Sequence, residues 1–178
     1  MSPIKKVNDE VFLAESGLVL VDGAQIEFLQ SQAARNPRHR ARLCAHKHGE
    51  DRIHEMLIAL TQDVYIRPHK HLNKSESFHV IAGSAIVVYF DDAGAIAEVI
   101  DIGDAASGRP FYFRDDDERY HTQIITSPFL VFHEVTNGPF NRADTLFAPW
   151  SPEETDVQAT RKFLEELKCR AAIGKEST

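Results

Sequence analysis

The sequence predicts a mainly β protein organised as a single domain, with one short helix before the β region and another after it. From residue 39 to about residue 148 the helical period is absent, and short runs rich in β-branched and aromatic residues alternate with turn signals. The chain has 178 residues, the size of one ordinary domain with a single core. A series of short strands at this spacing favours a sandwich or a barrel.

The N-terminal part, residues 1–38, is expected to form an arm and a helix. Asp22 followed by Gln25 resembles a capping box, and Ile26 and Leu29 begin a set of apolar residues at helical spacing. Asn36-Pro37 stops this pattern. The helix is therefore predicted over residues 23–35.

The β region, residues 39–150, contains the runs that we expect to be strands. They are residues 42–46, 55–60, 65–67, 77–90, 96–102, 111–113, 120–126 and 129–135. Asp91-Asp92-Ala93-Gly94 is a polar turn whose glycine accepts positive φ, so the strands on either side should form a hairpin. Gly83 interrupts the longest run and predicts a bend or a bulge there.

The C-terminal part, residues 151–178, is predicted to be a helix and a tail. Ser151-Pro152-Glu153-Glu154 offers a hydroxyl for the N-cap, a proline for the first helical position and a glutamate for the third. An apolar stripe that includes Phe163 and Leu167 follows. We expect a helix over about residues 152–171 that packs outside the barrel or on a partner subunit.

Charge and hydropathy exclude several classes of function. The 20 basic and 27 acidic residues give a formal net charge of -7, which argues against a nucleic-acid or anionic-membrane partner. The N-terminus lacks the apolar segment of a secretory signal, so a cytoplasmic location is expected. The basic run over residues 35–42 is interpreted as a solvated loop, with an anion site as the alternative.

His69-Lys70-His71, followed by Glu76, carries the strongest chemical signal. Side chains alternate along a strand, so both imidazoles should point to one face. Glu76 opens the next predicted strand, and we expect a hairpin to bring it beside the histidines. Imidazole and carboxylate ligands suit iron, manganese, nickel, zinc or copper. The residues thus predict a site for one divalent transition metal with open positions for a ligand or dioxygen.

The spacing His69-x-His71-x4-Glu76-x6-Gly83 resembles the first sequence motif of the cupin superfamily. The second cupin motif, Pro-x-Gly-x2-His-x3-Asn, is degenerate here, and only His121 matches it among the functional positions. The resemblance implies a double-stranded β-helix, also called a jelly-roll barrel, with His121 as the fourth ligand. It also implies a homodimer.

A narrower resemblance covers about residues 40–154 and concerns the WbuC family of cupin-fold metalloproteins. It is carried by Tyr65-Ile66-Arg67-Pro68-His69-Lys70-His71, Phe78-His79-Val80-Ile81-Ala82-Gly83, Phe132-His133-Glu134-Val135, Gly138-Pro139-Phe140 and Ala148-Pro149-Trp150. Members are associated with the biosynthesis of O-antigen and other surface polysaccharides. The resemblance implies a small polar ligand such as a sugar or a sugar nucleotide.

Four further residues are candidates for the site. His133 and Glu134 occupy opposite faces of their strand, and the one that faces the interior is a candidate acid or base. Arg67 is a candidate for binding a carboxylate or phosphate at the cavity mouth, with an ordinary surface arginine as the alternative. His46 is interpreted either as a pocket residue or as a structural histidine.

The reaction stays open at this stage. Isomerisation or epimerisation of a sugar and oxidation by iron and dioxygen are the two enzyme chemistries that fit such a metal site. A module that binds a sugar or a metal without catalysis is the main alternative, and a purely structural cupin is another.

Overall fold

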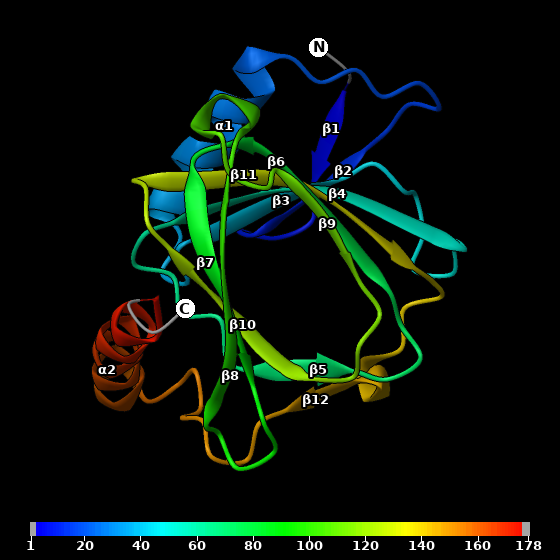
Figure 1. Ribbon diagram of the computed structural model, residues 1–178. Helices are drawn as coiled ribbons and strands as arrows, with labels where there is room; N and C mark the ends of the chain where they lie inside the picture. The colour runs from blue at the N-terminus through cyan, green and yellow to red at the C-terminus, as the bar shows by residue number, and fades with distance from the viewer. Residues whose placement is uncertain (1–2, 176–178) are drawn as a thin grey trace.

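A computed structural model describes residues 3–175 and shows two β-sheets that face each other, with two helices outside them (Figure 1). The larger sheet has the order β1 (Ile4–Lys6), β2 (Val11–Ala14), β3 (Arg40–Cys44), β4 (Ile53–Thr61), β11 (Phe129–Asn137), β6 (Glu76–Ala82), β9 (Tyr112–Asp115). The smaller sheet has the order β12 (Thr145–Phe147), β5 (His69–His71), β10 (Tyr120–Ile125), β7 (Ser84–Phe90), β8 (Ile96–Gly103). This arrangement confirms the predicted mainly β jelly-roll barrel.

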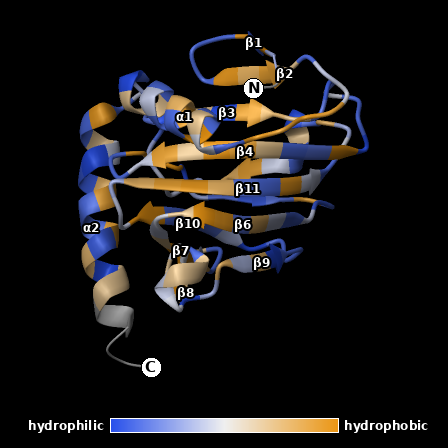
Figure 2. Ribbon diagram, turned by 90° about the horizontal axis from the view of Figure 1, so that it is seen from above, coloured by the Kyte–Doolittle hydropathy of each residue, from blue (hydrophilic) through white to orange (hydrophobic). Residues whose placement is uncertain are grey.

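The helices lie on the outer faces of the two sheets (Figures 1 and 2). Helix α1 (Gly23–Arg35) packs Leu29 and Ala33 against the larger sheet, and helix α2 (Val157–Lys175) packs Leu167 and Ala171 against the smaller one. The space between the sheets is filled at one end by an apolar core that includes Leu130. Strands that lie between the core and a helix are buried on both faces, which explains why β7 reads as an almost continuous apolar run.

Helix α1 confirms its prediction at both ends. Asp22 accepts a hydrogen bond from the amide of Ala24, and Gln25 accepts one from the amide of Asp22, which completes the capping box. The helix ends at Arg35, and Asn36 is extended, as a residue before proline prefers.

Gly83 marks the corner where the chain leaves one sheet for the other. Its φ is +87°, and a Cβ there would lie 2.0 Å from the carbonyl oxygen of Phe129, so only glycine fits. The predicted single strand over residues 77–90 is consequently two strands, β6 and β7, in different sheets. The predicted hairpin joins β7 to β8, with Gly94 at φ +88°.

Two β predictions are wrong. Residues 65–67 form no strand, because the Tyr65 hydroxyl donates to the carbonyl of Pro152 and Arg67 contacts Ser151 and Glu153. The expected hairpin between the His69 strand and the Glu76 strand is also wrong: β5 and β6 belong to different sheets, and residues 72–75 cross between them. Three short strands, β1, β2 and β12, were not predicted, since each offers too few residues for a recognisable alternation.

Helix α2 begins later than predicted. Asp156 caps it, because its carboxylate accepts from the amide of Ala159. Ser151 instead donates to the carbonyl of Ala148, so it belongs to the preceding turn. Within residues 3–175, neither helix has the combined length and hydropathy that would be needed to cross a membrane.

Candidate metal centre

Three imidazoles from two neighbouring strands converge inside the barrel. His69 and His71 lie on β5, and His121 lies on β10 directly opposite His69 in the antiparallel pairing. One ring nitrogen of each residue lies within 4.8 Å of the others. His71 and His121 are buried and His69 is partly buried. The three residues form a cluster that could hold a metal ion.

The hydrogen bonds of the rings orient one nitrogen of each toward the common centre. Nδ1 of His69 lies 2.8 Å from the carbonyl oxygen of Arg67, and Nδ1 of His121 lies 3.1 Å from that of Arg119. A carbonyl only accepts, so Nδ1 carries the proton in both rings and Nε2 keeps its lone pair. Nδ1 of His71 contacts the Thr145 hydroxyl at 3.1 Å, which fixes the position of the third ring; a hydroxyl can donate or accept, so this contact does not determine the tautomer.

Glu76 approaches this cluster from the larger sheet. Its Oε1 lies 3.2 Å from Nε2 of His71, and its Oε2 lies 3.9 Å from Nε2 of His121. The residue is 7% exposed. A buried carboxylate beside three imidazoles is a donor set that suits a divalent transition metal. The residues present therefore fit the metal that the cupin motif implies.

The surroundings of His69 and His71 keep these two imidazoles neutral, as metal ligands must be. Burial is the main cause that lowers the pKa of His71 to about 4, although the charge of Glu76 acts in the opposite direction. Burial and the neighbouring histidines likewise hold the pKa of His69 well below its usual value. Both rings are thus unprotonated at neutral pH.

The register of β11 decides between the two candidate acid–base residues. Val131 packs with the cluster under α1, while Phe132 packs in the barrel core. By alternation, Glu134 faces the interior and His133 the outer face, where it pairs across from Leu57 and His79. Burial and the nearby charge of Glu76 raise the pKa of Glu134 to about 8.

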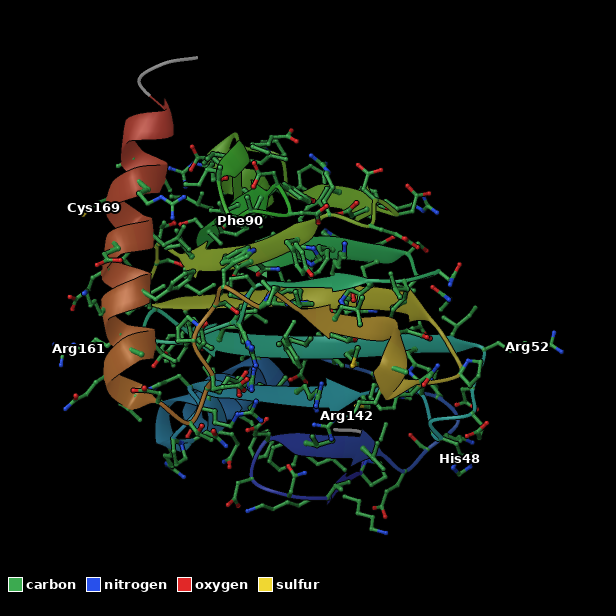
Figure 3. The ribbon with its side chains drawn as sticks, turned by 90° about the horizontal axis from the view of Figure 1, so that it is seen from below. His48, Arg52, Phe90, Arg142, Arg161 and Cys169 are labelled. Carbon is green, nitrogen blue, oxygen red and sulfur yellow. The ribbon has the colours of Figure 1, made fainter. Side chains whose placement is uncertain are left out.

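The two pocket candidates are held by other contacts. Nε of Arg67 donates to the Ser151 hydroxyl, and its guanidinium pairs with Glu153 and covers the ring of Phe147. Its carbonyl, rather than its charge, serves the site by orienting His69. His46 stacks on His54, with ring centroids 4.1 Å apart. His48, two residues further along the chain, is exposed and points away from the barrel (Figure 3).

The basic run over residues 35–42 is partly neutralised. Arg38 pairs with Glu10 at 2.8 Å, and Arg40 pairs with Glu154 at 3.0 Å. These contacts tie the N-terminal arm and the segment before α2 to strand β3. Because Arg38 and Arg40 are paired with carboxylates, these two residues do not support an anion site in this run.

Sequence reasoning missed two residues of the site. Thr145 lies on the unpredicted strand β12, opposite His71 in the pairing. Lys74, in the loop 72–75, reaches back to the site and places Nζ 3.5 Å from Oε1 of Glu76. Lys74 lies within the motif, between His71 and Glu76, but its inward direction could not be predicted. It follows from the loop, which crosses between the two sheets.

Comparison with known proteins gives a partial family match. A model described as a domain of unknown function (DUF6016) matches residues 21–102, a region that includes His69, His71 and Glu76 but ends before His121. No curated protein matches the chain.

Solved structures resemble the barrel at low sequence identity. A crystal structure of the capsular polysaccharide assembling protein CapF from Staphylococcus aureus has 17% identity and a TM-score of 0.50, over 63% of this chain and 32% of that chain. This structural likeness supports the same fold class as the two facing sheets described above. The chain has the cupin fold. It spans about a third of the CapF chain that it matches.

Two further structures match this cupin barrel more weakly. A double-stranded β-helix protein from Klebsiella pneumoniae has 14% identity and a TM-score of 0.47, over 61% of this chain and 79% of that chain. The DMSP lyase DddQ from Ruegeria pomeroyi has 14% identity and a TM-score of 0.48, over 64% of this chain and 54% of that chain.

Proposed function

We propose that this cupin binds one divalent transition metal through His69, His71, Glu76 and His121 and uses it to act on a small polar molecule. The observation that carries the proposal is the convergence of three imidazoles whose Nδ1 atoms are engaged elsewhere, with a buried carboxylate beside them. A metal held there would supply a Lewis acid for a carbonyl or hydroxyl oxygen, or a position for dioxygen.

Glu134 is the residue that we assign to proton transfer. It faces the interior from the same sheet as Glu76, and in the metal-free protein burial and the charge of Glu76 raise its pKa to about 8. A protonated carboxyl can donate to a developing oxyanion and accept the proton back later. His133 is assigned no such part, because it faces the opposite side of the sheet.

The ligand class that we propose is a sugar or sugar nucleotide, in surface-polysaccharide biosynthesis. This proposal rests on the resemblance to the WbuC family. The likeness to CapF carries the fold alone, since the identity is 17%. Sugar isomerisation or epimerisation and iron-dependent oxidation stay alternatives, as does a binding module without catalysis, and the proposed assembly is a homodimer.

The metal is tested first by substitution and elemental analysis. We expect purified wild-type protein to hold close to one metal per chain, and His69→Ala or Glu76→Ala to lose at least 10-fold in metal affinity. His79→Ala is the matched control, because His79 lies on the same strand as Glu76 but faces outward beside Phe111. Equal metal content in all four proteins would refute the proposed site.

The reaction is tested next by assay of sugar nucleotides with and without oxygen. Turnover that persists without oxygen supports isomerisation or epimerisation and refutes the oxygenase. Tight binding of metal and sugar with no product in either atmosphere supports the binding module.

A further inference from the structure

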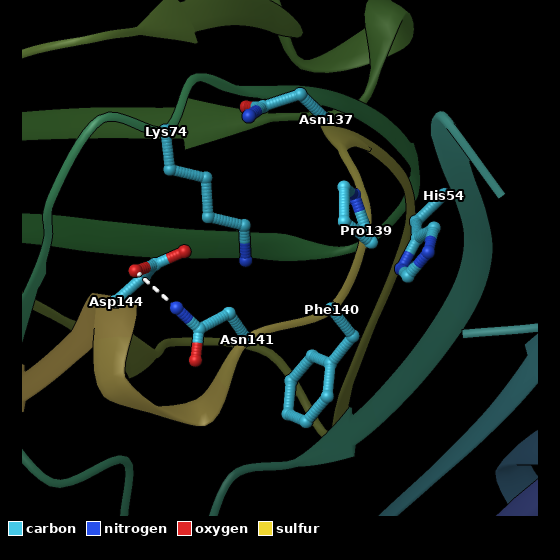
Figure 4. A pocket seen from close by; sticks show the side chains of 7 residues that line it. All are labelled: His54, Lys74, Asn137, Pro139, Phe140, Asn141 and Asp144. Atoms are coloured by element: carbon cyan, nitrogen blue, oxygen red, sulfur yellow. Dashed lines mark hydrogen bonds between the residues drawn. The ribbon is translucent and has the colours of Figure 1, made fainter. Parts of the chain in front are cut away.

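Lys74 lies beside the proposed metal site, with Nζ 3.5 Å from Oε1 of Glu76 and its side chain partly exposed. It lines two adjoining pockets, one of about 10 Å³ with His54, Asn141 and Asp144 and one of about 370 Å³ with Asn73 and Asn137. Figure 4 shows its side chain running into the smaller pocket, with the ammonium pointing toward the side chains of Asn141 and Asp144. The larger one is an open hollow at the surface, next to the proposed metal site, with room for a small ligand.

The backbone on both sides of Lys74 is held in place. The amide of Asn73 donates to the Glu118 carboxylate at 3.0 Å, and the amide of Ser75 donates to the Asn137 side chain at 2.8 Å. The amide of Leu72 donates to the carbonyl of Asp144 at 2.8 Å. Asn73 itself has a φ of +54°. A loop fixed by three separate segments presents its lysine in a defined direction, whereas a solvated lysine needs no such support.

The ammonium of Lys74 and the imidazole of His71 both contact the same carboxylate oxygen of Glu76. Oε1 of Glu76 lies 3.5 Å from Nζ of Lys74 and 3.2 Å from Nε2 of His71. Lys74 is the cation near both Glu76 and the interior residue Glu134. Its side chain is 17% exposed, so its charge is poorly solvated. If a metal takes Glu76, the ammonium loses its close anionic partner, and an unpaired buried charge is costly.

We propose that Lys74 selects small monocarboxylate ligands for the site, by pairing its ammonium with the ligand carboxylate while Glu76 holds the metal. This inference rests on the proposed metal function. Asp116 and Glu118 line the solvent side of the larger cavity. Both are exposed, and their charges oppose every negative charge that a ligand adds, although solvent screens them. Among the ligands proposed above, a sugar acid, with one carboxylate and neighbouring hydroxyls, is therefore favoured over a sugar nucleotide.

The test uses glycolate and its neutral counterpart ethylene glycol as probes of the manganese-loaded protein. Binding is followed through the broadening of the probe's methylene proton signal by Mn²⁺. We expect Lys74→Gln to lower glycolate affinity about 10-fold, since a hydrogen bond to a charged group is lost. Ethylene glycol binding should not change. Lys74→Gln should also bind Mn²⁺ at least as tightly as the wild type, because Glu76 then has one fewer competing cation.

Two variants complete the design. Lys74→Arg keeps the charge and should keep glycolate affinity within about threefold of wild type. Lys70→Gln is the control, because Lys70 points to the other face and contacts Asp92 and Tyr120. Manganese content is measured first. A wild-type protein that takes up neither manganese nor any other divalent transition metal refutes the metal function and this inference with it. Manganese-loaded Lys74→Gln that binds glycolate within twofold of wild type overturns the inference alone.

Discussion

At the scale of single residues, the site depends on which way each side chain points. Glu134 and His133 are neighbours in sequence, but one faces the proposed metal ligands and the other faces outward. Glu134 also has a raised pKa, because burial and the charge of Glu76 disfavour its ionised form. A carboxyl kept protonated in the folded state links stability to pH.

Glu134→Gln should flatten the dependence of stability on pH in metal-free protein. The folded pKa of about 8 lies above the ordinary value of 4.5, so the folded state binds more protons between these pH values. Wild-type stability should therefore fall as pH rises from 6.5 to 8, by at most about 1.4 kcal/mol per pH unit. Below pH 6.5, the lowered pKa values of His69 and His71 act in the opposite direction.

Urea denaturation at pH 6.5, 7.2 and 8 measures this slope. Glu165→Gln, at an exposed position of α2, is the control and should keep the wild-type slope. A Glu134→Gln protein with the wild-type slope would show that Glu134 ionises normally in the fold.

At the scale of elements, the corner at Gly83 and the contact of α2 hold the two sheets in their positions. Gly83 carries the chain from β6 to β7, and Leu167 anchors α2 on the outer face of the smaller sheet. One substitution at the corner and one in α2 test how much each contributes to the stability of the fold.

Gly83→Ala should destabilise the protein by about 3 kcal/mol, because a side chain at φ +87° is strained and the new Cβ would meet the Phe129 carbonyl. Gly23→Ala is the control, since nothing lies within 4 Å of a Cβ there. It should change stability by less than about 1 kcal/mol. Chemical denaturation of both variants measures the difference, and equal stabilities would contradict the assigned corner.

Leu167→Ala should cost about 2–5 kcal/mol, because the side chain is 2% exposed and its loss leaves a cavity under α2. Cys169→Ala, on the exposed side of the same helix (Figure 3), should change stability by less than about 0.5 kcal/mol. Thermal unfolding followed by circular dichroism compares the two. Similar melting temperatures would mean that α2 contributes little to the fold.

At the scale of the whole molecule, the proposed metal would join the two sheets. His69, His71 and His121 come from the smaller sheet, and Glu76 comes from the larger one. Without a metal, that end of the barrel contains polar groups where the other end contains an apolar core. Metal binding should therefore contribute directly to stability.

Metal at 100 times its dissociation constant should stabilise the fold by about 2.7 kcal/mol, which raises Tm by about 5–10 °C for a chain of this size. Addition of a chelator should reverse the shift. His79→Ala should respond as the wild type does, and Glu76→Ala should respond much less. A Tm that is unchanged by metal in the wild-type protein would contradict the proposed site.

The amino-acid sequence was sufficient to predict the fold class, helix α1, the β7–β8 hairpin and the motif residues His69, His71 and Glu76. These features depend on local chemistry, such as capping, alternation and the conformational freedom of glycine, which neighbouring residues fix. The start of α2 was placed too early because Ser151 resembles an N-cap, but its hydroxyl is engaged by Ala148 and Arg67.

The residues that surround the motif are brought there by tertiary contacts between distant parts of the chain. Glu76 meets the histidines across two sheets rather than through a hairpin, and Lys74 turns inward because its loop crosses between those sheets. The register of β11 places Glu134, and not His133, on the interior face. The guanidinium of Arg67 pairs with Glu153 in the C-terminal segment instead of binding a ligand at the cavity mouth. Such outcomes depend on pairing between distant strands, which no local pattern specifies.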